Sequence, residues 1–211
     1  MKFTEYYNLN ERLGSEFRNL IVVDVQPLYE ENITKKFSIE DFGNFLTTIK
    51  KNILYFYNGP ETIGSEDSQE AITNWLIENN PDLENFEWDK ISWVQKSYSF
   101  YRDFMDAGVS NNGMKQALRY MAINRKHDSR DISIDVWKNV LPEKDFNNIK
   151  DNLEDESLTI WTPDISIGEL KDNWDGSLIC GGGQNECLKE IQLLLNAFNI
   201  SYKLVDSYIY Y

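Results

Sequence analysis

Three residues whose side chains could support nucleophilic catalysis follow apolar runs in separate parts of the chain: Asp24, Lys96 and Cys187. A thiol at the start of a helix is favoured as thiolate by the helix dipole and by free backbone N–H groups, which can also hold an oxyanion. A nearby aspartate could take and return a proton, and a lysine could stabilise charge on both partners. Together the three predict a nucleophile, a base and a cation that need no histidine.

Six short apolar runs could position these side chains. They are Leu20–Asp24, Ile53–Tyr57, Ile91–Gln95, Leu158–Thr162, Leu178–Cys180 and Tyr202–Val205. Most are continuous rather than alternating, which is typical of strands covered on both faces. Helical patterns separate several of them, beginning after Ser38, after Ser65 or Ser68, and near Asn185. This order predicts an α/β fold with a doubly wound, mostly parallel six-stranded sheet of order 3-2-1-4-5-6.

One segment, from about residue 104 to residue 156, interrupts the alternation of strands and helices. It contains three helical patterns, at Met114–Arg125, Ile134–Val140 and Asp145–Leu153, and no good strand among them. We therefore expect one domain over residues 1–211 with a helical insertion between the third and fourth strands. The insertion could be a lid over the site, a dimer arm or both.

The composition narrows the classes of function. Apolar residues make up 41% of the chain and charged residues 27%, as in ordinary globular proteins, and the net charge is −14. A surface rich in carboxylates argues against nucleic-acid binding, because phosphates repel it. There is no apolar leader or membrane-length apolar stretch, and the two cysteines favour a reduced, cytoplasmic protein. A single histidine excludes a multi-histidine metal centre.

The motifs around the three candidate residues resemble those of the isochorismatase-like cysteine hydrolase superfamily, which includes the nicotinamidases. Asp24 ends an apolar strand and Gln26 follows two residues later. Lys96 precedes a Ser-Tyr-Ser-Phe stretch. The segment Gly181-Gly-Gly-Gln-Asn-Glu-Cys187, called the elbow below, resembles the family's nucleophile turn and precedes a helix and a short strand ending at Asp206.

The resemblance implies a hydrolase that cleaves an amide or related C–N bond of a small molecule through a thioester on Cys187. Asp24 would be the base and Lys96 its electrostatic partner, with Gly182 and Gly183 forming the elbow near the oxyanion and an unusual cis peptide between them. The residues expected to contact substrate are Gln26, Tyr29, Tyr98, Phe100 and Asn185. The family's metal-binding Asp-x-His pattern has no counterpart here, so we expect no metal and no cofactor. The resemblance also implies a homo-oligomer.

Two features of the elbow leave other functions open. Gln184 stands where the family has threonine, and Glu186 places a carboxylate beside Cys187, which would raise the pKa of the thiol. These motivate a non-catalytic relative that binds a partner through its insertion. A weaker alternative is a magnesium-dependent nuclease that uses Asp24 and Glu186. The second cysteine, Cys180, lies among apolar residues and is expected in the core.

Overall fold

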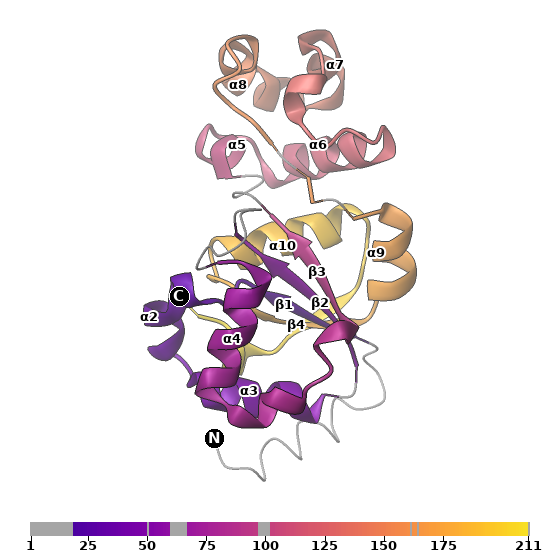
Figure 1. The fold of residues 1–211 in the computed structure, drawn as a ribbon. Coiled ribbons are helices and arrows are strands. Elements are labelled where there is room, and N and C mark those ends of the chain that lie inside the picture. The colour runs from indigo at the N-terminus through magenta and orange to yellow at the C-terminus, as the bar shows by residue number, and fades with distance from the viewer. Residues whose placement is uncertain are drawn as a thin grey trace.

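The computed structural model describes residues 19–49, 51–59, 67–96, 102–160, 162–163 and 165–210. Its centre is one parallel sheet of five strands in the order β3-β2-β1-β4-β5 (Figure 1). The strands are β1 (Asn19–Val23), β2 (Asn52–Tyr57), β3 (Ile91–Gln95), β4 (Ser177–Gly181) and β5 (Tyr202–Leu204). The predicted doubly wound α/β class is confirmed.

The three central strands, β1, β2 and β4, are buried on both faces, as their continuous apolar runs predict. All five residues of β1 are buried, and they alternate between two hydrophobic clusters. Ile21 and Val23 pack in the cluster that includes helices α6 (Asn111–Ile123), α9 (Ile167–Trp174) and α10 (Cys187–Ala197). Leu20 and Val22 pack in the cluster that includes α3 (Ile39–Thr48) and α4 (Gln69–Asn79). Successive side chains of a strand point to opposite faces, so a strand covered on both sides must be apolar throughout.

The flanking helices after Ser38, after Ser68 and from Cys187 follow the predicted patterns, whereas α2 (Glu30–Thr34) and α9 are further helices that no pattern predicted. Their bounds are α2 (Glu30–Thr34), α3 (Ile39–Thr48), α4 (Gln69–Asn79), α9 (Ile167–Trp174) and α10 (Cys187–Ala197), with short 3₁₀ helices η1 (Pro27–Tyr29), η2 (Pro81–Asn85), η3 (Trp88–Lys90) and η5 (Asp206–Tyr208). Ser38 caps α3 by accepting a hydrogen bond from the Asp41 N–H group at 2.9 Å, and Ser68 caps α4 in the same way from Ala71 at 3.2 Å.

The prediction of a strand at Leu158–Thr162 is wrong, so among the described residues the sheet has five strands and not six. The backbone of this segment forms hydrogen bonds with a turn about 30 residues earlier in the chain. Ile160 N–H donates to Ser129 Oγ at 2.8 Å, and Thr162 N–H donates to the His127 carbonyl at 3.0 Å. The place beside β1 is taken by β4, whose five residues are all buried. A short apolar run can bury its side chains without joining the sheet, and periodicity alone does not separate the two cases.

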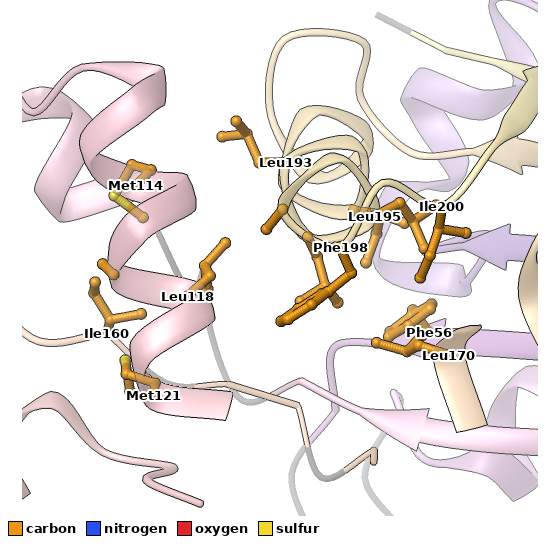
Figure 2. Packing of buried hydrophobic residues seen from close by; sticks show 14 of the residues in the cluster. Phe56, Met114, Leu118, Met121, Ile160, Leu170, Leu193, Leu195, Phe198 and Ile200 are labelled. Carbon is orange, nitrogen blue, oxygen red and sulfur yellow. The ribbon is translucent and has the colours of Figure 1, made fainter. Parts of the chain in front are cut away.

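The predicted helical insertion is present and lies beyond the carboxyl-terminal edge of the sheet (Figure 1). It consists of α5 (Arg102–Asp106), α6 (Asn111–Ile123), η4 (Ser129–Asp131), α7 (Ile134–Val140) and α8 (Glu143–Glu154). Helix α6 packs against α10, and Figure 2 shows Leu118 of α6 pointing toward the helix that carries Leu193. The insertion is therefore joined to the main domain through its hydrophobic core.

Within the described part of the chain, no helix combines the length and the apolar character needed to cross a membrane.

The elbow that follows β4 requires glycine at its first position, which gives a test of the fold. Gly181 has φ +75°, and a Cβ atom there would lie 2.2 Å from the Val23 carbonyl oxygen. We expect Gly181→Ala to lower the free energy of unfolding by about 1 to 3 kcal/mol, measured by urea denaturation.

The matched control is Gly168→Ala in α9, where an added Cβ atom would meet nothing within 4 Å. Alanine is the better helix former, so this variant should be as stable as the wild type or more so. Equal stability of the two variants would show that the elbow backbone is not constrained as described.

Candidate active site

Asp24 follows β1 directly and is held in an uncommon backbone conformation. Its φ is +47°, a left-handed value that few residues other than glycine adopt. Its N–H group donates to the Phe56 carbonyl at 2.9 Å, and its carbonyl accepts a hydrogen bond from the Tyr210 hydroxyl at 2.8 Å. Backbone strain of this kind is stored where the surroundings enforce it, commonly at functional sites. The Asp24 side chain is fully buried.

Lys96 meets Asp24 from the end of β3. The Lys96 N–H group donates to the Tyr57 carbonyl at 2.8 Å, which extends the pairing of β3 with β2 by one residue. Its Nζ atom forms an ion pair with Oδ2 of Asp24 and lies 3.4 Å from Oε2 of Glu190, a residue of α10. Burial alone would lower the pKa of Lys96, but the charges of the two carboxylates outweigh it and raise the pKa above its ordinary value.

The elbow delivers Cys187 to the same place. Gly182 has φ +72°, and a Cβ atom on it would lie 2.9 Å from the Leu188 nitrogen, so the turn can pack closely against the start of α10. The Gly183 carbonyl accepts hydrogen bonds from Glu186 N–H at 3.0 Å and Leu188 N–H at 3.2 Å. The described peptide bonds are all trans, so the cis peptide implied at Gly182–Gly183 is not present. Cys187 is the first residue of α10 and is half-buried.

The Cys187 thiol is neutral at rest, which corrects the prediction that the helix terminus favours its thiolate. Burial is the largest cause that raises the pKa of Cys187, to about 12 from an ordinary 9.0. The charge of Asp24 adds to the increase, Lys96 opposes it, and hydrogen bonding to Asp24 and the charge of Glu190 add further. Burial and the two carboxylates thus outweigh the effect of the lysine.

Glu186, which sequence analysis expected to perturb the thiol, keeps its side chain largely in solvent. Its side chain is 64% exposed and pairs with Arg102, with Nη1 and Oε1 3.9 Å apart. Asp24, with which the nuclease alternative combined it, is by contrast fully buried. Among the described residues, no group of three His, Cys, Asp or Glu side chains could hold a metal ion.

A cavity of about 890 Å³ opens over Cys187 and Lys96. Its described lining residues are Tyr29, Asn58, Lys96, Arg102, Asp103, Met105, Asp106, Arg130, Thr159, Asn185, Glu186, Cys187 and Lys189. Six of these, from Arg102 to Thr159, belong to the helical insertion or to the segment that follows it. The insertion therefore forms one wall of the cavity, opposite the ends of the strands.

The residues expected to contact substrate fall into three groups. Tyr29 and Asn185 line the cavity. Gln26 is buried and braces the neighbouring loop, because its Nε2 donates to the Asn58 carbonyl at 2.9 Å and its Oε1 accepts from Asn58 N–H at 3.1 Å. Tyr98 and Phe100 lie outside the described residues.

Two residues of the site were not found by sequence reasoning. Glu190 lies one turn after Cys187, and a carboxylate within the apolar stripe of α10 is the signal that could have identified it. Tyr210 lies 186 residues from Asp24 in the chain. Its hydroxyl donates to the Asp24 carbonyl after β1, and its own carbonyl accepts a hydrogen bond from Gln184 N–H in the elbow. No local pattern in the tyrosine-rich tail distinguishes it from its neighbours.

No protein-family model, curated protein or solved structure matches this chain.

The raised pKa of Cys187 predicts slow alkylation. A thiol whose pKa is raised stays protonated over a wider pH range, so at pH 8 iodoacetamide should modify Cys187 roughly 10- to 100-fold more slowly than a small free thiol. The rate should keep rising with pH beyond pH 9, as measured by mass spectrometry of the Cys187 peptide.

Cys180 supplies the internal control, because its thiol is fully buried in β4 and should stay unlabelled until the protein unfolds. A plateau in the Cys187 rate below pH 9 would contradict the described environment of the thiol.

Proposed function

We propose that this protein is a cysteine hydrolase that cleaves an amide or related C–N bond of a small molecule through a thioester on Cys187. The observation that carries the proposal is the meeting of Asp24, Lys96 and Cys187, from the ends of β1 and β3 and the start of α10, beside one cavity. Nucleophile, base and cation are all within reach of one reacting carbonyl group.

The reaction begins from the neutral thiol. The Sγ proton passes to the Asp24 carboxylate as sulfur bonds to the carbonyl carbon of the substrate. The C–N bond then breaks as Asp24 returns that proton to the leaving nitrogen, which leaves a thioester and a free amine. Water next gives a proton to Asp24 and attacks the thioester, and the released sulfur takes the proton back, which frees the acid.

Charge that develops on the carbonyl oxygen has candidate donors nearby. The first N–H groups of a helix have no acceptor within the helix, and Cys187 occupies the first position of α10. Together with Gly183 N–H, the Cys187 N–H group forms the proposed oxyanion site. Lys96 stabilises the thiolate as it forms, since its charge lowers the pKa of Cys187.

The cavity volume of about 890 Å³ supports a small-molecule substrate, because sites for such ligands measure roughly 300 to 1,000 Å³. We also propose that the chain is a divergent isochorismatase-like protein that acts in the cytoplasm as a homo-oligomer, without a cofactor and without binding nucleic acid. The order of Asp24, Lys96 and Cys187 along the chain and their meeting at the strand ends support this assignment.

The raised pKa of Cys187 favours a second candidate, a non-catalytic relative that binds a partner through the insertion. The two candidates differ in whether Cys187 carries an acyl group during turnover.

Trapping the thioester tests the proposed hydrolase. With a panel of small primary and secondary amides, amine release should be accompanied by an acyl adduct on the Cys187 peptide after acid quenching. Cys187→Ala should abolish both signals. Asp24→Asn should slow amine release by roughly 10²- to 10⁴-fold, because the base that accepts the thiol proton is lost.

The same Asp24→Asn change should accelerate alkylation of Cys187, because it removes a charge that raises the pKa of the thiol. Slower amine release together with faster alkylation of Cys187 would indicate loss of the base, because misfolding would not produce these two opposite effects. Cys180→Ala removes the other thiol and should retain turnover. Amine release that survives Cys187→Ala would refute the proposal, and a panel that leaves Cys187 unacylated would favour the non-catalytic candidate.

A further inference from the structure

Glu190 is a fully buried carboxylate on a helix face that is otherwise apolar. The buried neighbours on α10 are Leu188, Ile191, Leu193, Leu194, Leu195 and Ala197. Glutamate is almost never fully buried unless it is paired, because removal of its charge from water is costly. Its Oε2 atom lies 3.4 Å from Nζ of Lys96, which is itself almost completely buried. A leucine at position 190 would pack equally well among these apolar neighbours, so packing does not account for a charged side chain there.

Lys96 faces two carboxylates, Asp24 from β1 and Glu190 from α10. We propose that Glu190 is a positioning residue that keeps Lys96 paired and in place while Asp24 carries the proton of the Cys187 thiol. This inference rests on the proposed hydrolase, in which Asp24 alternates between a charged and a neutral form.

The need for a second carboxylate follows from counting charges through the first step. At rest Asp24 and Glu190 are negative, Lys96 is positive and the thiol is neutral. Transfer of the Sγ proton to Asp24 neutralises the closer partner of Lys96. A buried ammonium that loses its partner is strongly disfavoured, which would oppose the transfer. With Glu190 present, the lysine retains a counter-charge throughout and remains beside the new thiolate.

A double-mutant cycle tests the pairing without any substrate. Asp24→Asn imitates the state in which Asp24 is neutral, and Glu190→Gln removes the second charge at nearly constant shape. We expect Glu190→Gln to lower the urea midpoint much more in the Asp24→Asn background than in the wild type, because only the former leaves Lys96 without either carboxylate. Adding Lys96→Met to the double variant should restore stability, because it removes the buried ammonium.

Asp145 provides the matched control. It is a buried carboxylate on α8 that accepts hydrogen bonds from Ser110 N–H at 3.1 Å and Ser110 Oγ at 2.6 Å. Asp145→Asn should lower the urea midpoint by the same amount in the wild-type and Asp24→Asn backgrounds. If Glu190→Gln also lowers it by the same amount in both backgrounds, the inference is wrong. If the double variant fails to fold, the Lys96→Met triple variant decides: folding supports the pairing, and failure overturns it.

Alkylation of Cys187 gives a readout that a purely structural role would not move. Glu190 is one of the charges that raise the pKa of the thiol, so Glu190→Gln should increase the iodoacetamide rate at pH 8 by roughly two- to threefold, whereas Asp145→Asn should not change it. Cys180 should stay unlabelled in both variants. An unchanged Cys187 rate, or labelling of both cysteines, would contradict the assigned role. These outcomes are independent of whether an amide is ever hydrolysed.

Discussion

The buried ion pair between Asp24 and Lys96 is the constraint on which the rest of the site depends. Two charges removed from water each cost several kcal/mol, and they recover that cost only when their geometry is good and further partners are present. The pair therefore ties the end of β1 to the end of β3 across the intervening β2, and Glu190 extends it to α10. The strained backbone of Asp24 is held from both sides, by Phe56 and by Tyr210. Movement of β1, β3 or α10 relative to the other two would therefore separate buried charges.

The sheet order explains why residues so far apart in the chain can meet. In a doubly wound sheet, parallel strands present their carboxyl ends at one edge, and the crossover connections bring successive loops to that edge. Asp24, Asn58 and Lys96 follow three adjacent strands, and the elbow follows the fourth. The helical insertion then closes the open side, because its residues form a wall of the cavity over Cys187. The main domain supplies the reactive groups, and the insertion bounds the space in which a ligand would lie.

Sequence reasoning succeeded where a single local pattern decides the structure, as in the continuous apolar strands and the Ser38 cap. It failed where a partner far along the chain decides. Ile160 lies in an apolar run, but Ser129 satisfies its N–H group and keeps it out of the sheet. Glu190 is 94 residues from Lys96, and Tyr210 is 186 residues from Asp24, so neither contact leaves a local signature. The assignment of Asp24, Lys96 and Cys187 to one place needed only strand ends and sheet order, which local patterns do provide.

The helix terminus and burial act in opposite directions on the pKa of the Cys187 thiol, and their sizes differ. A helix terminus stabilises a charge by roughly 0.3 to 1 kcal/mol at an exposed position, which favours the thiolate. The increase in the pKa of Cys187 from 9.0 to about 12 corresponds to about 4 kcal/mol in the opposite direction, so burial together with the carboxylates of Asp24 and Glu190 dominates. A neutral resting thiol next to a charged aspartate is protected from adventitious electrophiles. In the proposed reaction it would become a nucleophile only when a carbonyl group is close enough for bond formation to drive the proton onto Asp24. Under that proposal, the burial that weakens the free thiol would make its reactivity depend on a bound substrate, and Lys96, which lies between two carboxylates, would keep a negative partner while the proton moves.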